Sequence, residues 1–211
     1  NLAKSLNWNI TAQQVADLEN YLSVFQDGYK WLDELHELLP KSRFSKRSYS
    51  APDQNENPFN AWYVRTSIEA NQSGSLKGKK VAVKDNIFVQ DVPLSNGSRV
   101  LENLIADYDA VVVESILEAG GDIVGKTNCE YFCLSGGSAT SYSGTVDNPR
   151  KENFSTGGSP SGSAALVAGG EVDIALGTDQ GGSVRSPASW TGTVGMKATR
   201  DLVPYDGAIV M

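Results

Sequence analysis

Three short segments of this chain carry the residue types that acyl transfer requires. Residues 157–165 read Gly-Gly-Ser-Pro-Ser-Gly-Ser-Ala-Ala, and residues 178–185 read Thr-Asp-Gln-Gly-Gly-Ser-Val-Arg. Upstream of both, residues 81–86 read Val-Ala-Val-Lys-Asp-Asn. A serine hydroxyl is a poor nucleophile at neutral pH and needs a base that removes its proton during attack. Together the segments offer a nucleophilic serine, a second hydroxyl that can relay the proton, and a lysine base.

Other uses of these segments fit the sequence less well. The chain has one histidine, His36, in an amphipathic N-terminal segment far from the serine clusters in sequence, and it contains no G-x-S-x-G nucleophile elbow. Both facts argue against a Ser-His-Asp hydrolase. A phosphate-binding P-loop would need a Gly-Lys pair after the glycine-rich cluster, and none follows here.

The three segments resemble those of the amidase signature enzymes, which use a Ser-Ser-Lys triad. The family pattern is a lysine at the end of a K-D-N-type strand, then a G-G-S-S-G-G-S segment, then a D-x-G-G-S segment. Here 75 residues separate Lys84 from Ser159, and 24 separate Ser159 from Ser183. Both spacings are similar to those of the family, and a three-part match at fixed spacing is a specific signal.

Smaller features refine this resemblance. Residues 57–63 and 203–205 are similar to those of bacterial enantioselective amidases that carry an N-terminal helical extension. Three positions depart from the family pattern: Pro160 stands in place of a serine, Ala198 in place of a proline, and Asp201 in place of a glycine. These departures concern the support of the lysine and a later turn, rather than the triad itself.

The resemblance implies a role for each residue of the triad. Ser183 is the nucleophile, Lys84 is the base, and Ser159 passes the proton between them. The relay serine follows an unusual cis peptide bond in the family, which here would join Gly158 to Ser159. A lysine accepts a proton only when it is neutral, and burial beside apolar strand residues favours that form.

The same resemblance implies a support for the nucleophile. The backbone N–H groups of Gln180, Gly181, Gly182 and Ser183 would form an oxyanion hole. Asp179 and Arg185 flank this loop and are expected to form an ion pair that fixes it. The resemblance implies no metal and no cofactor.

Composition narrows the classes of function. A formal net charge of −7 and a pI near 4.8 argue against a nucleic-acid partner, because phosphate binding needs clustered lysine and arginine. No stretch approaches the length of apolar residues that spans a membrane. Cys129 and Cys133 are interpreted as core thiols. The start lacks an initiator methionine and an apolar signal region, so we expect a fragment edge and a cytoplasmic protein.

The N-terminal residues predict helices. Thr11 with Gln14 is typical of a capping box. We expect Gly28 to break the first helix, and a second helix to end before Pro40. The sequence thus predicts a helical hairpin and a polar linker over residues 1–60. The apolar stripe of the hairpin would dock on the body of the same chain or, alternatively, form a homodimer.

From residue 61 onward, short strands and helices alternate. Strands are expected at 80–83, 123–125 and 173–177, and helices from a cap at Asp109, around residues 128–134 and over 163–168. This alternation predicts an α/β fold. With the resemblance, we expect an amidase-signature-type mixed sheet flanked by helices over residues 61–211. Family members usually have a much longer catalytic region, so the chain is expected to hold only its N-terminal part.

The expected function is that of an amidase, which hydrolyses a small-molecule carboxylic amide to acid and ammonia through an acyl-serine intermediate at Ser183. Two alternatives stay open. One is the A subunit of a glutamine-dependent tRNA amidotransferase, and the other is a truncated, non-catalytic relative. The N-terminal helical extension favours the stand-alone amidase.

Overall fold

The computed structural model describes residues 5–34, 42, 44, 47–70, 73–102 and 104–210. The chain divides into two compact units, Asn1–Leu39 and Pro40–Met211. In the described part of the chain, no helix combines the length and the apolar character needed to cross a membrane.

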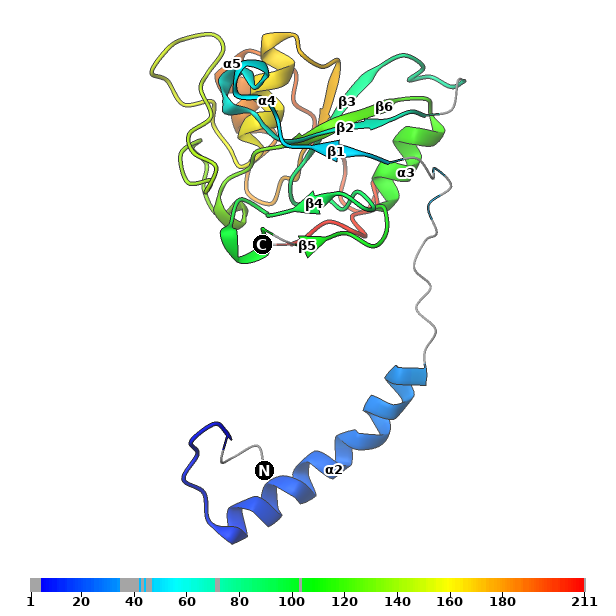
Figure 1. Cartoon of the computed structure of the whole chain (residues 1–211), viewed down its shortest axis with the longest axis vertical. Helices are drawn as coiled ribbons and strands as arrows, with labels where there is room; N and C mark the ends of the chain where they lie inside the picture. The colour runs from blue at the N-terminus through cyan, green and yellow to red at the C-terminus, as the bar shows by residue number, and fades with distance from the viewer. Residues whose placement is uncertain are drawn as a thin grey trace. The chain divides into compact units, whose positions relative to one another are not determined.

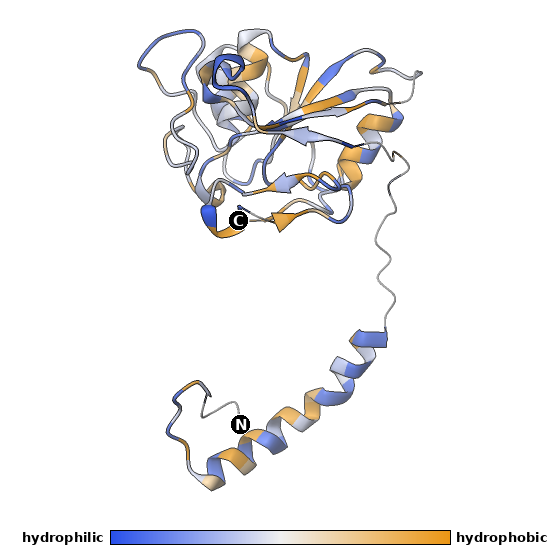
Figure 2. Cartoon of the chain, in the orientation of Figure 1, coloured by the Kyte–Doolittle hydropathy of each residue, from blue (hydrophilic) through white to orange (hydrophobic). Residues whose placement is uncertain are grey.

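The smaller unit contains one long helix, α2 (Ala12–Glu34), along which apolar and polar residues alternate (Figure 2). The predicted capping box is confirmed, because the N–H of Thr11 donates to Gln14 Oε1 at 2.8 Å and the N–H of Gln14 donates to Thr11 Oγ1 at 3.3 Å. The predicted break at Gly28 is wrong, since the helix runs through it. One glycine costs a helix only about 1 kcal/mol relative to alanine. The rest of the predicted second helix, with His36, lies outside the described residues.

The larger unit is organised around a five-stranded mixed sheet (Figure 1). Strand β2 pairs antiparallel with β1 and β6, whereas β3 pairs parallel with β6 and β7. The predicted α/β fold with a mixed sheet is therefore confirmed. In spatial order the strands are β1 (Tyr49–Ser50), β2 (Trp62–Ile68), β6 (Asp122–Thr127), β3 (Lys80–Lys84) and β7 (Ile174–Leu176).

A helix covers each face of this sheet. Successive side chains of a strand point to opposite faces, so Val81 and Val83 of β3 pack in one core with α3 (Val111–Glu118). Ala82 lies between them in sequence and packs in the second core with α4 (Ser161–Gly169). Helix α5 (Arg185–Thr191) lies beside α4 (Figure 1). A separate ribbon pairs β4 (Pro93–Leu94) with β5 (Leu104–Ile105).

Asp109 does not cap a helix as predicted. Helix α3 begins at Val111 without a side-chain cap. The Asp109 carboxylate instead accepts the N–H of Gln90 at 2.8 Å and forms an ion pair with Arg47, whose side chain is also almost fully buried. A buried carboxylate is stabilised by a charged, hydrogen-bonding partner, which this arginine supplies.

Part of the predicted polar linker, from residue 47 onward, is structured. Residues 49–50 form β1 and extend the edge of the sheet, and Arg47 belongs to the buried ion pair with Asp109. The 3-10 helices Gln54–Glu56 and Pro58–Asn60 lead from β1 toward β2. From residue 47 onward, the chain is therefore part of the larger unit rather than a linker.

The predicted helix over residues 128–134 is a single 3-10 turn, Tyr131–Cys133. The N–H of Glu130 donates to Ser159 O at 3.0 Å, and that of Phe132 donates to Asn96 O at 2.9 Å. These backbone groups bind neighbouring loops instead of a helical ladder. The segment thereby contacts the loops that contain Ser159 and Asn96.

Candidate functional site

The ends of three parallel strands bring the candidate residues together. Strand β3 ends at Lys84, β6 ends at Thr127, and β7 ends two residues before Thr178. The carboxyl ends of parallel strands meet at one edge of a sheet. Lys84 also follows the alternation of Ala82 and so faces α4, which begins just after Ser159. The fold thus joins residues that are far apart in sequence.

Lys84 and Ser159 lie in direct contact at this edge. Both are fully buried, and Lys84 Nζ donates to Ser159 Oγ at 2.7 Å. The peptide bond between Gly158 and Ser159 is cis, as expected. Lys84 Nζ also donates to Thr178 Oγ1 at 2.6 Å, and Asn86 Nδ2 donates to the same oxygen at 3.1 Å. The lysine amine is therefore held between two hydroxyl groups.

Ser183 lies five residues beyond Thr178, in the loop that leads to α5, and is half-buried. No hydrogen bond among the described residues joins its hydroxyl to Ser159 or Lys84. The structure thus brings two of the three predicted triad residues into contact and leaves the third in the neighbouring loop.

Asp179 organises the loop that holds Ser183. Its carboxylate accepts the N–H of Gly182 at 2.8 Å and that of Val184 at 3.1 Å, and it forms an ion pair with Arg185 at 3.0 Å. Burial would raise the pKa of Asp179, but the arginine and the backbone N–H groups lower it to about 2. The φ of Gly182 is +129°, a conformation that favours glycine.

These contacts bear on the expected oxyanion hole. The N–H of Gly182 already donates to Asp179, so it is engaged before any substrate binds. The N–H groups of Gln180, Gly181 and Ser183 donate to no acceptor within the described residues. Three of the four predicted donors therefore remain available to a ligand.

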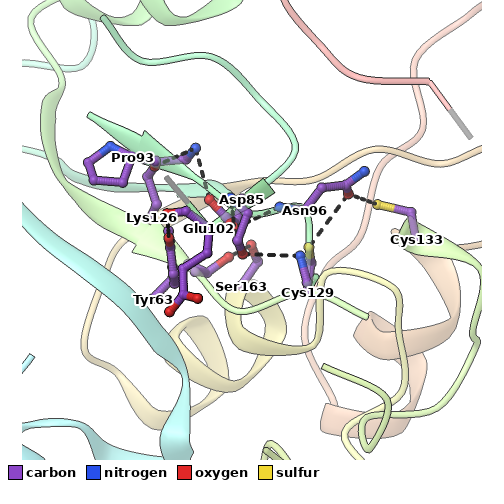
Figure 3. A network of polar contacts seen from close by, with 12 residues as sticks. Tyr63, Asp85, Pro93, Asn96, Glu102, Lys126, Cys129, Cys133 and Ser163 are labelled. Carbon is purple, nitrogen blue, oxygen red and sulfur yellow. Dashed lines mark hydrogen bonds and ion pairs between the residues drawn. The ribbon is translucent and has the colours of Figure 1, made fainter. Parts of the chain in front are cut away.

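Asp85, the residue after Lys84, forms a buried ion pair with Lys126 (Figure 3). Lys126 Nζ lies 2.9 Å from Asp85 Oδ1, and both side chains are almost completely buried. Asp85 Oδ2 also accepts the N–H of Ser95 at 2.9 Å and that of Asn96 at 3.0 Å. Burial raises the pKa of Asp85 and lowers that of Lys126, and their mutual attraction opposes both effects. The pair ties the loop after β4 to the strand that carries Lys84.

Sequence reasoning did not identify two residues of this region, Thr178 and Lys126. Thr178 directly precedes Asp179 in the second serine cluster, and its position just after a predicted strand could have indicated a role at the site. Lys126 gave no such signal, because a lysine in a short strand is usually exposed. Among the described residues, no group of three or more His, Cys, Asp or Glu side chains could hold a metal ion.

A family model described as Amidase matches residues 51–211. The chain belongs to the amidase family. The resemblance to amidase signature enzymes is thereby confirmed. The chain is 50% identical over 161 residues to the enantioselective amidase of Rhodococcus rhodochrous, a match that covers 75% of this chain and 31% of that protein. The predicted similarity to enantioselective amidases is confirmed as well.

The chain is also similar to A subunits of amidotransferases and to a peptide amidase. The A subunit of glutamyl-tRNA(Gln) amidotransferase from Halobacterium salinarum is 48% identical over 151 residues, covering 72% of this chain and 36% of that protein. The crystal structure of its counterpart from Thermotoga maritima superimposes with a TM-score of 0.67 at 41% identity, covering 71% of this chain and 33% of that one. Native peptide amidase from Stenotrophomonas maltophilia gives a TM-score of 0.60 at 37% identity, with 65% and 29% covered. The chain spans about a third of the length of these relatives.

Proposed function

We propose that this chain carries the acyl-transfer centre of an amidase that hydrolyses a carboxylic amide to acid and ammonia. The observation that carries the proposal is the buried contact between Lys84 Nζ and Ser159 Oγ, at 2.7 Å. A fully buried amine held against a hydroxyl lies within the distance at which the two groups can exchange a proton. Ser183, in the neighbouring glycine-rich loop, is the proposed nucleophile.

The proposed reaction begins with proton transfer. When substrate is bound, Lys84 Nζ accepts the proton of Ser159 while Ser159 accepts the proton of Ser183, and Ser183 Oγ attacks the amide carbonyl carbon. This step requires Ser183 Oγ to come within hydrogen-bond distance of Ser159 Oγ when substrate binds, and such contacts often tighten only in the substrate complex.

The remaining steps stabilise the oxyanion, break the C–N bond and hydrolyse the acyl-enzyme. The free N–H groups of Gln180, Gly181 and Ser183 stabilise the oxyanion, and each such donor is worth roughly 3 kcal/mol. The C–N bond then breaks as the relay returns the proton to the nitrogen, which leaves as ammonia. Water hydrolyses the acyl-Ser183 ester and regenerates the hydroxyl. The ion pair of Asp179 and Arg185 is proposed to hold this loop in shape.

Two observations bear on the kind of amide. The similarity to an enantioselective amidase supports a small-molecule amide. The nearly equal similarity to the A subunits of amidotransferases supports a second candidate, in which the amide is glutamine and the protein works in a tRNA-dependent complex. We favour the first candidate because α2 forms an N-terminal helical extension, which is typical of the enantioselective amidases that the sequence resembles. A truncated, non-catalytic relative remains the third candidate, and a cytoplasmic location stays a prediction from the sequence.

The test compares this chain with an extended protein. In the extended protein, residue 211 is followed by the part of the Rhodococcus rhodochrous amidase that comes after its matched region. Ammonia release is measured from an aromatic carboxamide and from glutamine. We expect the extended protein to act on the carboxamide and the chain alone to be at least about 100-fold slower, comparable to the loss of one oxyanion donor. The reason is that Val194 and Met196, which follow α5, are apolar but 98% and 78% exposed, and we expect the added part to cover this segment.

Three other outcomes would change this interpretation. Equal turnover by the two proteins would show that catalysis does not need the added part. Release from glutamine alone would favour the amidotransferase. Absence of turnover by a folded extended protein, with the intact Rhodococcus amidase active in the same assay, would reject the proposal.

We also propose that α2 mediates a homodimer. Its exposed side chains include Tyr21, Leu22 and Phe25, and the rings of Tyr21 and Phe25 meet edge to face at 5.3 Å. Exposed apolar clusters of this kind often mark interfaces. We expect sedimentation velocity to detect a dimer that Leu22→Glu converts to a monomer. A monomer at all concentrations would reject this proposal without affecting the catalytic one.

A further inference from the structure

Two cysteines lie beside the candidate catalytic centre and take no part in the proposed reaction. Cys129 and Cys133 are both free and buried. The 3-10 turn between them ends with Cys133 in a left-handed conformation, at a φ of +62°. This turn brings both sulfurs to one acceptor: Cys129 Sγ lies 3.9 Å and Cys133 Sγ lies 3.2 Å from Asn96 Oδ1 (Figure 3). Both sulfurs therefore contact the same side-chain oxygen.

The surroundings of the two sulfurs differ in charge. Contact with the Cys129 thiol lowers the pKa of Cys133, burial raises it, and the charge and hydrogen bond of Lys84, with a hydrogen bond from Ser159, bring it to about 6. The same thiol contact, burial and the negative charge of Asp85 raise the pKa of Cys129. The positive charge of Lys84 lowers the pKa of Cys129, and Lys126, which is paired with Asp85, also faces this thiol. Cys133 is therefore the more acidic of the two thiols.

We propose that Cys129 and Cys133 form a peroxide-reactive dithiol, in which Cys133 is oxidised first and Cys129 then closes a disulfide. The thiolate is the reactive form of cysteine, and its oxidation product condenses readily with a neighbouring thiol. Cys133 is 3% exposed, which suits an oxidant about the size of a water molecule better than a bulky reagent.

The chemistry balances with hydrogen peroxide as the oxidant. The Cys133 thiolate attacks one peroxide oxygen, so that an S–O bond forms while the O–O bond breaks. Hydroxide leaves, and the sulfur becomes a sulfenic acid. Cys129 Sγ then attacks that sulfur, so that the S–S bond forms while the S–O bond breaks, and the departing hydroxide takes the Cys129 proton as water. Two electrons pass from the dithiol to the peroxide.

The experiment uses the folded 211-residue chain and needs no amidase activity, so it can be carried out and read whether or not the chain hydrolyses amides. The two cysteines are the only ones in the chain, and both fall in one tryptic peptide, residues 127–150. The chain is treated with hydrogen peroxide, denatured, alkylated with iodoacetamide and digested. We expect the peptide to lose two hydrogens in mass and to take up no alkyl group, and dithiothreitol to restore both sites.

The pH dependence of this reaction has a defined sign. The Cys133 thiolate is populated above its pKa of about 6. The initial rate of oxidation is therefore expected to rise with pH, with its midpoint near that value, well below the range of an ordinary cysteine. A midpoint near pH 8.5, where free cysteine titrates, would contradict the assignment of Cys133 as the reactive thiol.

Matched single variants separate the two roles. In Cys129→Ser, Cys133 should still react, and dimedone should trap its sulfenic acid. In Cys133→Ser, Cys129 should react at least about tenfold more slowly. If Cys133→Ser does not fold, the position of the earliest dimedone adduct in the wild-type chain decides which sulfur reacts first. Both cysteines remaining alkylatable after excess peroxide, a disulfide that joins two chains, or equal rates in the two variants would each overturn the proposal.

Discussion

Replacing Ser183 by alanine is expected to reduce amide hydrolysis by the extended protein by several orders of magnitude, to background. The substitution removes the oxygen that forms the acyl bond, and loss of a nucleophile in an acyl-transfer enzyme commonly costs about 10⁶-fold in kcat. Lys84→Met should cost a similar amount, because it removes the base and leaves Ser159 without its 2.7 Å partner. The measurements are ammonia release under single-turnover conditions and capture of the acyl-protein by mass spectrometry.

Two variants serve as controls for this result. Ser189→Ala alters an exposed serine on α5, a few residues beyond the nucleophile, and should keep near-full activity. His36→Ala should also leave the rate almost unchanged, because no histidine takes part in the proposed mechanism. Retained activity in Ser183→Ala would refute the assignment of the nucleophile. A large loss in a folded His36→Ala variant would refute the histidine-free mechanism.

Replacing Lys126 by methionine is expected to lower the free energy of unfolding by about 3–5 kcal/mol. Removing one partner of a buried ion pair leaves an uncompensated charge, and that cost is of this size. Asp85 would keep its hydrogen bonds from Ser95 and Asn96 but lose its counter-ion. Urea unfolding of the 211-residue chain, followed by circular dichroism, measures the change.

A second lysine provides the matched control for Lys126. Lys79 forms an ion pair with Asp173 at 2.8 Å, but the two side chains are 51% and 36% exposed. An ion pair in solvent contributes about 1 kcal/mol or less, so Lys79→Met should have little effect. Equal effects of the two substitutions would show that burial of Lys126 does not set its contribution.

The sequence was informative where a local motif coincides with a fixed structural position. Lys84 and Ser159 could be paired from their motifs alone, because the spacing between these two motifs is characteristic of the family. The capping box at Thr11 was also predictable, since its two hydrogen bonds join residues only three apart in the chain.

The errors arise where tertiary contacts override a local pattern. Asp109 stands at a suitable capping position, but a buried arginine 62 residues away binds its carboxylate instead. The segment that follows β6 has a helical spacing of cysteines, yet its N–H groups bind the loops that contain Ser159 and Asn96. Lys126 and Thr178 owe their importance to partners on other strands, which no local pattern could indicate.

The alternation of side chains along β3 and into the next residue places two opposite charges on opposite faces of the sheet. Lys84 and Asp85 are adjacent in sequence and opposite in charge, yet the amine contacts Ser159 on the α4 side while the carboxylate contacts Lys126 on the other. The amine and the carboxylate therefore have different partners, although they are neighbours in the chain. A shift of β3 by a single residue would bring a carboxylate to Ser159 in place of the amine, without any change in amino-acid composition. The proton acceptor that this chemistry needs is thus encoded by register as much as by residue identity.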